Sequence, residues 1–121
     1  MHSVSEIEEN LKRGILEMLI LRALCEEDLY GYQMADIINM KSCGKINIKE
    51  GSLYGPLYRL IDKQCISENK VLVGKRRTRI YFHIEQLGRE YLQQLIDVYT
   101  RMNDGVSLIL KGGGTNNEAR K

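Results

Sequence analysis

The sequence predicts a mainly α-helical fold that carries one β-hairpin and ends in a long helix. Three observations predict it: apolar residues recur with helical spacing up to about residue 64, alternate strictly between residues 66 and 84, and return to helical spacing from residue 85. The chain has 121 residues, of which 43% are hydrophobic and 28% are charged. We therefore expect one domain with a packed core.

The first helix is expected over residues 5–24. Ser5 is a suitable N-cap because Glu8 follows three residues later, as in a capping box. After Gly14 the helix becomes apolar around most of its circumference, which indicates burial on more than one side. We expect one side to face its own domain and another side to face a partner subunit.

A second, shorter helix is expected over residues 30–40, with Tyr32 and Ile38 pointing inward. The turn after it contains Gly44, which can supply a positive φ. Residues 46–48 alternate between apolar and polar, so they form either a very short strand or an extended lead-in to the next helix.

The third helix is expected over residues 50–64. Leu53, Leu57 and Leu60 fall on one face, and Pro56 is tolerated if it lies within the first turn. The opposite face carries hydroxyl, aromatic and basic side chains, and with Lys49 just before the helix these are the candidate DNA-binding residues, namely Lys49, Ser52, Tyr54, Tyr58, Arg59 and Lys63. One apolar and one donor-rich face suit insertion into a nucleic-acid groove, although many solvated surface helices share this pattern.

Residues 66–84 are expected to form a β-hairpin with a glycine at its turn. Basic side chains crowd the tip, namely Lys75, Arg76, Arg77 and Arg79. Such a tip would attract phosphate, but charges on an edge hairpin also prevent aggregation. Three helices followed by a hairpin match the winged helix-turn-helix arrangement, in which the third helix enters the major groove of double-stranded DNA.

The last helix is expected over residues 85–111, with apolar residues at steps of four and three that are typical of a helix pair. It would be about 39 Å long, too long for a small domain to cover. The predicted homodimer interface consists of Leu11, Ile15, Met18, Leu87, Tyr91, Leu95, Val98, Met102 and Val106. An alternative use of this region is a ligand pocket lined by Met18, Tyr91, Tyr99 and Met102.

The elements divide the chain into three regions. We expect a winged helix-turn-helix domain over residues 1–84, a dimerisation helix over residues 85–111 and a disordered tail over residues 112–121. The N-terminus lacks a signal peptide's order of residues, and no apolar run is long enough for a membrane span. The expected location is the cytoplasm, with no membrane contact.

Several function classes are not expected. Cys25, Cys43 and Cys65 form no CxxC pair, and neither histidine stands at metal-ligand spacing to them. The sequence shows no Ser-His-Asp or Cys-His arrangement and no phosphate-binding glycine loop, so we expect neither an enzyme nor a cofactor or metal. The net charge of +2 is too small to indicate nucleic acid by itself, and only the placement of charge does so.

Four segments together resemble the PadR family of transcriptional regulators: YGYQMADII, GSLYGPLYRLIDKQCI, GKRRTRIYFHI and LGREYL. The likeness covers about residues 9–110 and is to the short subfamily with one C-terminal helix. The resemblance implies a homodimeric repressor in which the terminal helices build the dimer, the third helix reads an inverted repeat and Tyr54 contacts the DNA backbone. It also implies release from DNA by a small aromatic or cationic effector.

The sequence departs from that family at three points. Gln64 stands where a glycine is usual, so its backbone is expected to be strained or different. Glu85 replaces the usual threonine cap, and the absence of tryptophan excludes a pocket built from paired tryptophans.

The alternative function is a winged-helix module that binds a protein or a ligand without sequence-specific DNA binding.

Overall fold

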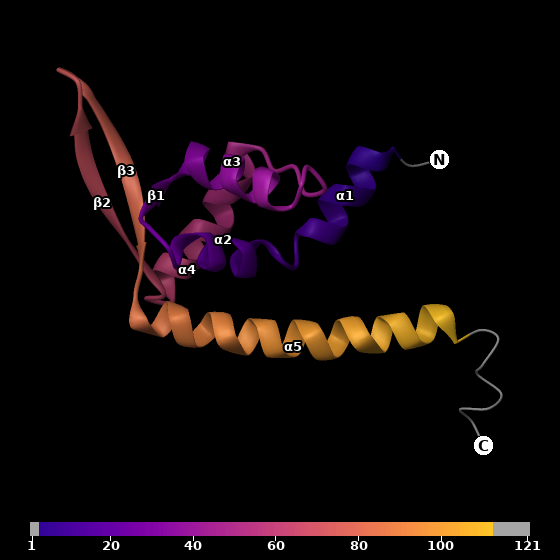
Figure 1. Ribbon diagram of the computed structural model, residues 1–121. Coiled ribbons are helices and arrows are strands. Elements are labelled where there is room, and N and C mark those ends of the chain that lie inside the picture. Colours follow the sequence, from indigo (N-terminus) through magenta and orange to yellow (C-terminus); the bar gives the residue numbers. More distant parts are fainter. Residues whose placement is uncertain (1–2, 113–121) are drawn as a thin grey trace.

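The computed structural model describes residues 3–112 and confirms a mainly helical fold with a hairpin and a long last helix. Its elements are α1 (Val4–Lys12), α2 (Leu16–Leu24), β1 (Leu29–Tyr30), α3 (Gly31–Lys41), the 3-10 helix η1 (Glu50–Leu53), α4 (Tyr54–Asp62), β2 (Ile66–Val73), β3 (Arg77–Ile84) and α5 (Gln86–Lys111). Figure 1 shows the β2–β3 hairpin projecting from a helical body and α5 running beneath that body. Apart from Gly112, the tail predicted for residues 112–121 lies outside the described residues.

The single helix predicted over residues 5–24 is wrong, because the chain turns at residues 13–15. The N–H of Ile15 donates to the carbonyl of Lys12 at 2.9 Å, which closes this turn. Gly14 lies inside it, and glycine weakens a helix because it gains the most freedom when the helix unwinds. The break separates α1, which has no buried residue, from α2, which supplies much of the core.

The N-cap of α1 lies two residues before the predicted one. The side chain of Ser3, not Ser5, accepts a hydrogen bond from the N–H of Glu6 at 3.1 Å. Ser5 lies within the helix. Both serines have a glutamate three residues later, so the sequence pattern alone could not separate them.

Helix α3 buries Met34 and Ile38, which are four residues apart and therefore share a face. Tyr32 lies off that face and is 62% exposed, so its predicted inward position is wrong. The turn after α3 contains Gly44 at φ +77°, as predicted, and also Cys43 at φ +56°. Residues 46–48 form no strand.

The sheet has the order β1-β3-β2 and is antiparallel throughout. The hairpin pairs Ile66 with Ile84 at its base and Val73 with Arg77 beside the tip, where Gly74 has φ +72°. The predicted hairpin is thus confirmed. The added strand β1 pairs Leu29 with Phe82 and ties the start of α3 to the hairpin.

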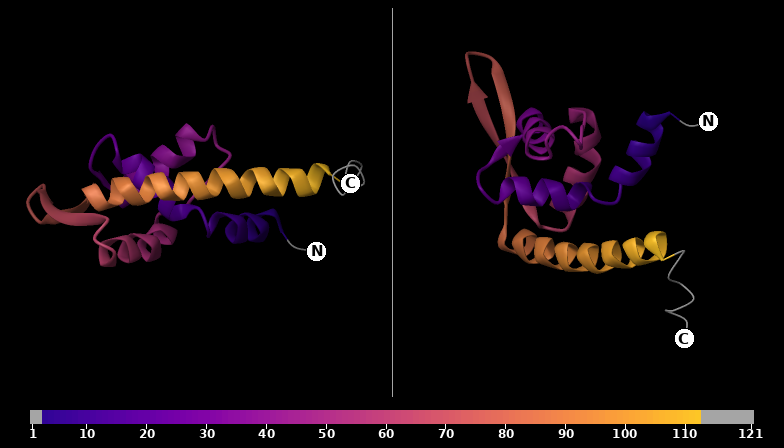
Figure 2. Two further views of the ribbon diagram at one scale, coloured as in Figure 1. Left: turned by 90° about the horizontal axis from the view of Figure 1, so that it is seen from below. Right: turned by 45° about the vertical axis from the view of Figure 1, so that its right-hand side comes forward.

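The hydrophobic core lies between the helices and the base of the hairpin. Every helix and strand except α1 supplies a buried side chain to it, for example Leu21 from α2, Met34 from α3, Leu57 from α4, Phe82 from β3 and Leu92 from α5. Figure 2 shows that the outer part of the hairpin stands clear of the helical body and that α5 crosses beneath it. The core therefore fixes the base of the hairpin and leaves its tip in solvent.

Helix α5 packs on its own domain through its first turns only. Gly88 is buried where α5 crosses the end of α4, and Leu92 reaches the core. Farther along, Val98, Met102 and Val106 are exposed. Within residues 3–112, no helix combines the length and the apolar character that crossing a lipid bilayer requires.

Candidate nucleic-acid interface

Helix α4 is held in the domain by one fully buried apolar face. Leu57 and Leu60 of α4 and Leu53 of η1 are completely shielded from solvent. Pro56 is the third residue of α4 and lies in its first turn, where its missing N–H leaves no helical hydrogen bond unmade. The opposite side of the helix is consequently free to present polar side chains.

The end of α4 is closed by a residue in left-handed conformation. Gln64 has φ +61°, so the expected strain at this position is confirmed. The N–H of Cys65 donates to the carbonyl of Leu60, and the N–H of Gln64 donates to that of Ile61, both at 2.9 Å. This is the Schellman pattern, which usually has glycine in the left-handed position. It turns the chain sharply into β2.

Tyr54 stands at the N-terminal end of α4 and is bonded to an acid. Its hydroxyl donates to Oε2 of Glu50 at 2.7 Å. This hydrogen bond, with burial and the carboxylate's charge, raises the pKa of Tyr54 to about 12. The start of α3 lies against the pair, because a Cβ on Gly31 would sit 2.9 Å from the Tyr54 hydroxyl. The ring of exposed Tyr58 follows, with its centroid 6.4 Å from that of Tyr54.

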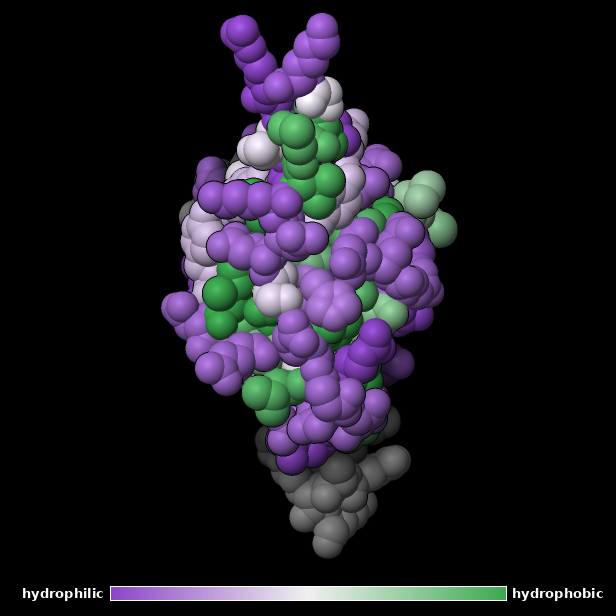
Figure 3. Space-filling model, turned by 90° about the vertical axis from the view of Figure 1, so that its left-hand side faces the viewer, coloured by the Kyte–Doolittle hydropathy of each residue, from purple (hydrophilic) through white to green (hydrophobic). Residues whose placement is uncertain are grey.

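The hairpin presents its cations at and near the tip. Lys75, Arg76 and Arg77 are all exposed. Figure 3 shows hydrophilic side chains at the tip that project beyond the rest of the surface. Arg79 is farther down β3, and its guanidinium lies over the ring of Tyr30, 4.3 Å from the centroid. This cation–π contact restrains the Arg79 side chain beside α4.

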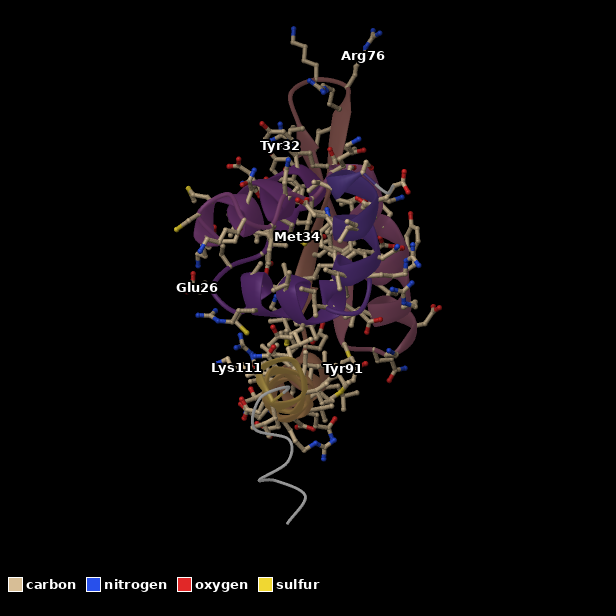
Figure 4. The ribbon with its side chains drawn as sticks, turned by 90° about the vertical axis from the view of Figure 1, so that its right-hand side faces the viewer. Glu26, Tyr32, Met34, Arg76, Tyr91 and Lys111 are labelled. Carbon is tan, nitrogen blue, oxygen red and sulfur yellow. The ribbon has the colours of Figure 1, made fainter. Side chains whose placement is uncertain are left out.

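A cleft of about 240 Å³ lies between the N-terminal end of α4 and the hairpin. Tyr54 of α4 and Arg79 of β3 both line it, together with Glu50 of η1 and Tyr30 of β1. Ser52 instead lines a cleft of about 250 Å³ with Lys12, Arg13 and Arg59. Lys49 is exposed just before η1. In Figure 4, Tyr32 and Arg76 lie at the end of the molecule opposite Tyr91 and Lys111.

Arg59 and Lys63 are held by Glu17 of α2. Nε of Arg59 is 3.0 Å from Oε2 of Glu17, and Nζ of Lys63 is 3.1 Å from Oε1. Lys63 also donates to the hydroxyl of Tyr91 at 3.1 Å and lies over its ring. These two predicted DNA-binding cations therefore join α4 to α2 and α5 in this structure.

The charges in this group stabilise one another. Burial raises the pKa of Glu17, but hydrogen bonds and charge from Arg59 and Lys63 together outweigh it, so that the pKa lies below its ordinary value. The hydrogen bond with Tyr91 and the pairing with Glu17 raise the pKa of Lys63 above its ordinary value. Glu17 and Lys63 are thus both held in their ionised forms.

An apolar groove of about 430 Å³ runs between the α1–α2 turn and α5. Most residues predicted for a dimer interface line it, namely Leu11, Ile15, Met18, Leu95, Val98, Met102 and Val106. Tyr99 also lines it, so the groove contains three of the four predicted ligand-pocket residues. Leu87 and Tyr91 lie outside its lining.

Sequence reasoning missed three residues of this surface. Glu50 lies between two predicted contacts, Lys49 and Ser52, but is not among them. Tyr32 is predicted to point inward but is exposed, and the contact of Tyr30 with Arg79 is not predicted. Helical spacing was a usable signal for Tyr32 alone, because it lies two residues before Met34 and therefore on another side of the helix. Among residues 3–112, no group of three or more His, Cys, Asp or Glu side chains is placed to hold a metal ion.

Comparison with known proteins gives consistent results. The family model of the transcriptional regulator PadR-like family matches residues 20–94. A protein of Lysinibacillus sphaericus is 30% identical over 106 residues, which cover 88% of this chain and 97% of that protein. The crystal structure of a PadR family transcriptional regulator from Eggerthella lenta is 27% identical, with a TM-score of 0.75, and the match covers 88% of this chain and 91% of the other.

A further solved structure contains operator DNA. Bacillus subtilis PadR in complex with operator DNA has a TM-score of 0.63 and 20% identity, and the match covers 68% of this chain and 47% of that one. At this identity the likeness concerns the fold alone. The family model spans α4, the hairpin and the first turns of α5, the elements that form the surface described above. The chain belongs to the PadR-like family of transcriptional regulators.

Proposed function

We propose that the protein is a homodimeric repressor that binds an inverted-repeat operator in the cytoplasm. One observation carries this proposal: the N-terminal end of α4 and the cationic hairpin border one cleft, and the hairpin tip lies at the end of the molecule opposite α5. The operator-bound PadR structure, which shares this fold, supports the same use of the surface.

In this proposal the DNA contacts have different roles. Lys49, Ser52 and Tyr58 bind from α4 and the segment before it, because all three are exposed there. The tip cations Lys75, Arg76 and Arg77 bind phosphates without reading sequence, and Arg79 reaches the backbone from its place over Tyr30. Arg59 and Lys63 reach DNA only by leaving Glu17.

The dimer is proposed from the apolar groove and the exposed length of α5. Met102 and Val106 are 61% and 50% exposed in the single chain, and large exposed apolar surfaces usually mark an interface. We assign α5 of the second copy as the helix that covers the groove. Leu87 and Tyr91, at the margin of the same face, would contact that helix as well. Residues 1–84 then form the DNA-binding unit and residues 85–111 the dimerisation unit.

The groove also supports an effector site. Met18, Tyr99 and Met102 line it, and such side chains adapt to flat compounds. A small aromatic or cationic compound enclosed there by the second subunit would alter the separation of the two α4 helices. Tyr91 contributes from outside the groove, through its hydrogen bond with Lys63.

Selection of bound DNA from a random pool tests the proposal. The purified protein should enrich a two-fold motif whose half-sites are about one DNA turn, roughly 34 Å, apart. Light scattering should give twice the chain mass of 14.0 kDa. Failure to enrich any sequence would refute operator binding, and enrichment of a single half-site by a monomer would refute the dimer.

A further inference from the structure

One carboxylate lies among the donor groups of the proposed DNA surface. Glu50 is the first residue of η1 and is exposed. It lines the cleft shared with Tyr54 and Arg79, and it also lines a neighbouring cleft of about 360 Å³ with Lys49 and Tyr32. A negative charge at this position repels phosphate, so Glu50 is not a contact for the DNA backbone.

The Glu50 carboxylate is held in a defined orientation. Tyr54 donates its one hydroxyl proton to Oε2 at 2.7 Å, four residues along the chain. Gly31 packs against both groups, because a Cβ there would lie 2.9 Å from the Tyr54 hydroxyl and 3.1 Å from Oε2. An ionised carboxylate has about four acceptor positions, so most of its capacity is still available to a ligand.

This arrangement also limits what Tyr54 can do. While its proton is donated to Glu50, the Tyr54 hydroxyl can only accept a hydrogen bond, and a phosphate offers none. The backbone contact that the family resemblance implies for Tyr54 would therefore require the bond to Glu50 to break. If this bond is kept, Tyr54 orients the Glu50 carboxylate instead of contacting the DNA backbone.

We propose that Glu50 determines sequence specificity by accepting a hydrogen bond from the exocyclic amino group of a cytosine in the major groove, with Tyr54 as its positioning residue. Cytosine presents an N4 amino donor in the major groove, and a carboxylate is the side chain that accepts from it. This inference rests on the proposed operator binding. The surrounding cations meet the phosphates, so that Glu50 faces the base edges between them.

Selection from a random DNA pool, repeated with variants, tests this assignment. The wild type should require cytosine at one position of each half-site, and Glu50→Ala should relax that preference about tenfold at that position alone. Glu50→Gln should shift the preference towards adenine, because a glutamine amide pairs with N6 and N7 of adenine. Tyr54→Phe should weaken the cytosine preference without replacing it.

Asp36→Asn is the matched control. Asp36 is an exposed acid that lines the neighbouring cleft with Glu50, so the variant removes the same charge and should leave the preferred base unchanged. Unaltered preferences in both Glu50→Ala and Glu50→Gln would overturn the inference while operator binding stands. A uniform gain in affinity for all sequences would show that Glu50 only repels DNA. Absence of any selected motif in the wild type would refute operator binding itself.

Discussion

At the residue scale, the backbone of Gln64 predicts a stabilising substitution. The left-handed conformation costs an ordinary residue about 1–2 kcal/mol, whereas glycine adopts it freely but loses more entropy on folding. Gln64→Gly should therefore raise the free energy of unfolding by about 0.5–1 kcal/mol, as measured by urea denaturation. Asp62→Gly, inside the last turn of α4, should lower it by a similar amount. If both glycines destabilise, the strain at Gln64 is not relieved by glycine.

Glu17 predicts a pH-dependent contribution to stability. Glu17→Gln should lower the free energy of unfolding by about 1 kcal/mol at pH 7, because the charged bonds from Arg59 and Lys63 are weakened. The pKa of folded Glu17 lies below its ordinary value of 4.5, so its contribution is complete above that value and is lost as the pH falls through the folded pKa.

The measurement for Glu17 is thermal unfolding of both proteins between pH 3 and pH 7. The difference between wild type and Glu17→Gln should shrink below pH 4.5. Glu90→Gln on α5, where the acid is exposed and accepts a bond from Gln86 of the same helix, serves as the control and should change little. A difference that stays constant with pH would show that the two cations do not depend on the charge of Glu17.

These two residues show what sequence can reveal at this scale. The strain at Gln64 was predictable because glutamine stands here at a position where the family usually has glycine. The pairing of Glu17 with Arg59 was not predictable, because 42 residues separate them and neither follows a local spacing rule. Polar contacts between distant helices depend on packing angles, which apolar periodicity does not specify.

At the element scale, the crossing of α5 over the end of α4 depends on Gly88. A Cβ at this position would overlap the carbonyl oxygen of Cys65 and lie 2.9 Å from Cγ1 of Ile84. Gly88→Ala should therefore destabilise the protein by about 2 kcal/mol, since backbone atoms must move. Gly105→Ala in the same helix meets no atom within 4 Å and should stabilise by up to about 1 kcal/mol. Equal effects in thermal denaturation would contradict the close crossing.

The hairpin predicts a salt-dependent effect on DNA binding. Each phosphate that a cation neutralises contributes about −0.9 to the slope of log affinity against log salt, so Arg76→Ala with Arg77→Ala should make the slope shallower by about 1.8. Arg101→Ala with Lys111→Ala removes the same charge from α5 and should leave the slope unchanged. Fluorescence anisotropy over a salt series measures both. An unchanged slope in the hairpin variant would remove the tip from the interface.

The elements were predictable where a single period dominates the sequence. The β2–β3 hairpin and α5 follow alternation and helical spacing without interruption, and their predicted ranges agree with the structure. The first helix was predicted too long because the four-residue spacing of apolar residues continues from Leu11 to Ile15, across the turn at residues 13–15. Strand β1 has two residues, which is too few for any period to reveal.

At the scale of the whole molecule, the two proposed surfaces lie at opposite ends. The hairpin tip and the start of α3 lie at one end, and α5 lies at the other (Figure 4). Contacts of Lys63 with Glu17 and Tyr91 connect α4 to both α2 and α5. The second subunit would therefore set the distance between two α4 helices through α5, without touching the DNA surface itself.

The last prediction separates dimerisation from folding. Met102 is 61% exposed in the single chain, so Met102→Glu should leave the fold intact but place a charge in the proposed interface. The mass in solution should fall from twice 14.0 kDa to 14.0 kDa. Affinity for a two-fold operator should fall about 100-fold, because the second half-site no longer binds at high effective concentration.

Gln94→Glu adds the same charge to an exposed position of α5 outside the groove and should change neither mass nor affinity. Circular dichroism checks that both variants keep their helices. If Met102→Glu is still a dimer with full operator affinity, the second copy does not bind along this groove. In that case the apolar side of α5 must be covered by something other than a second α5, and the spacing of the two half-sites needs a different origin.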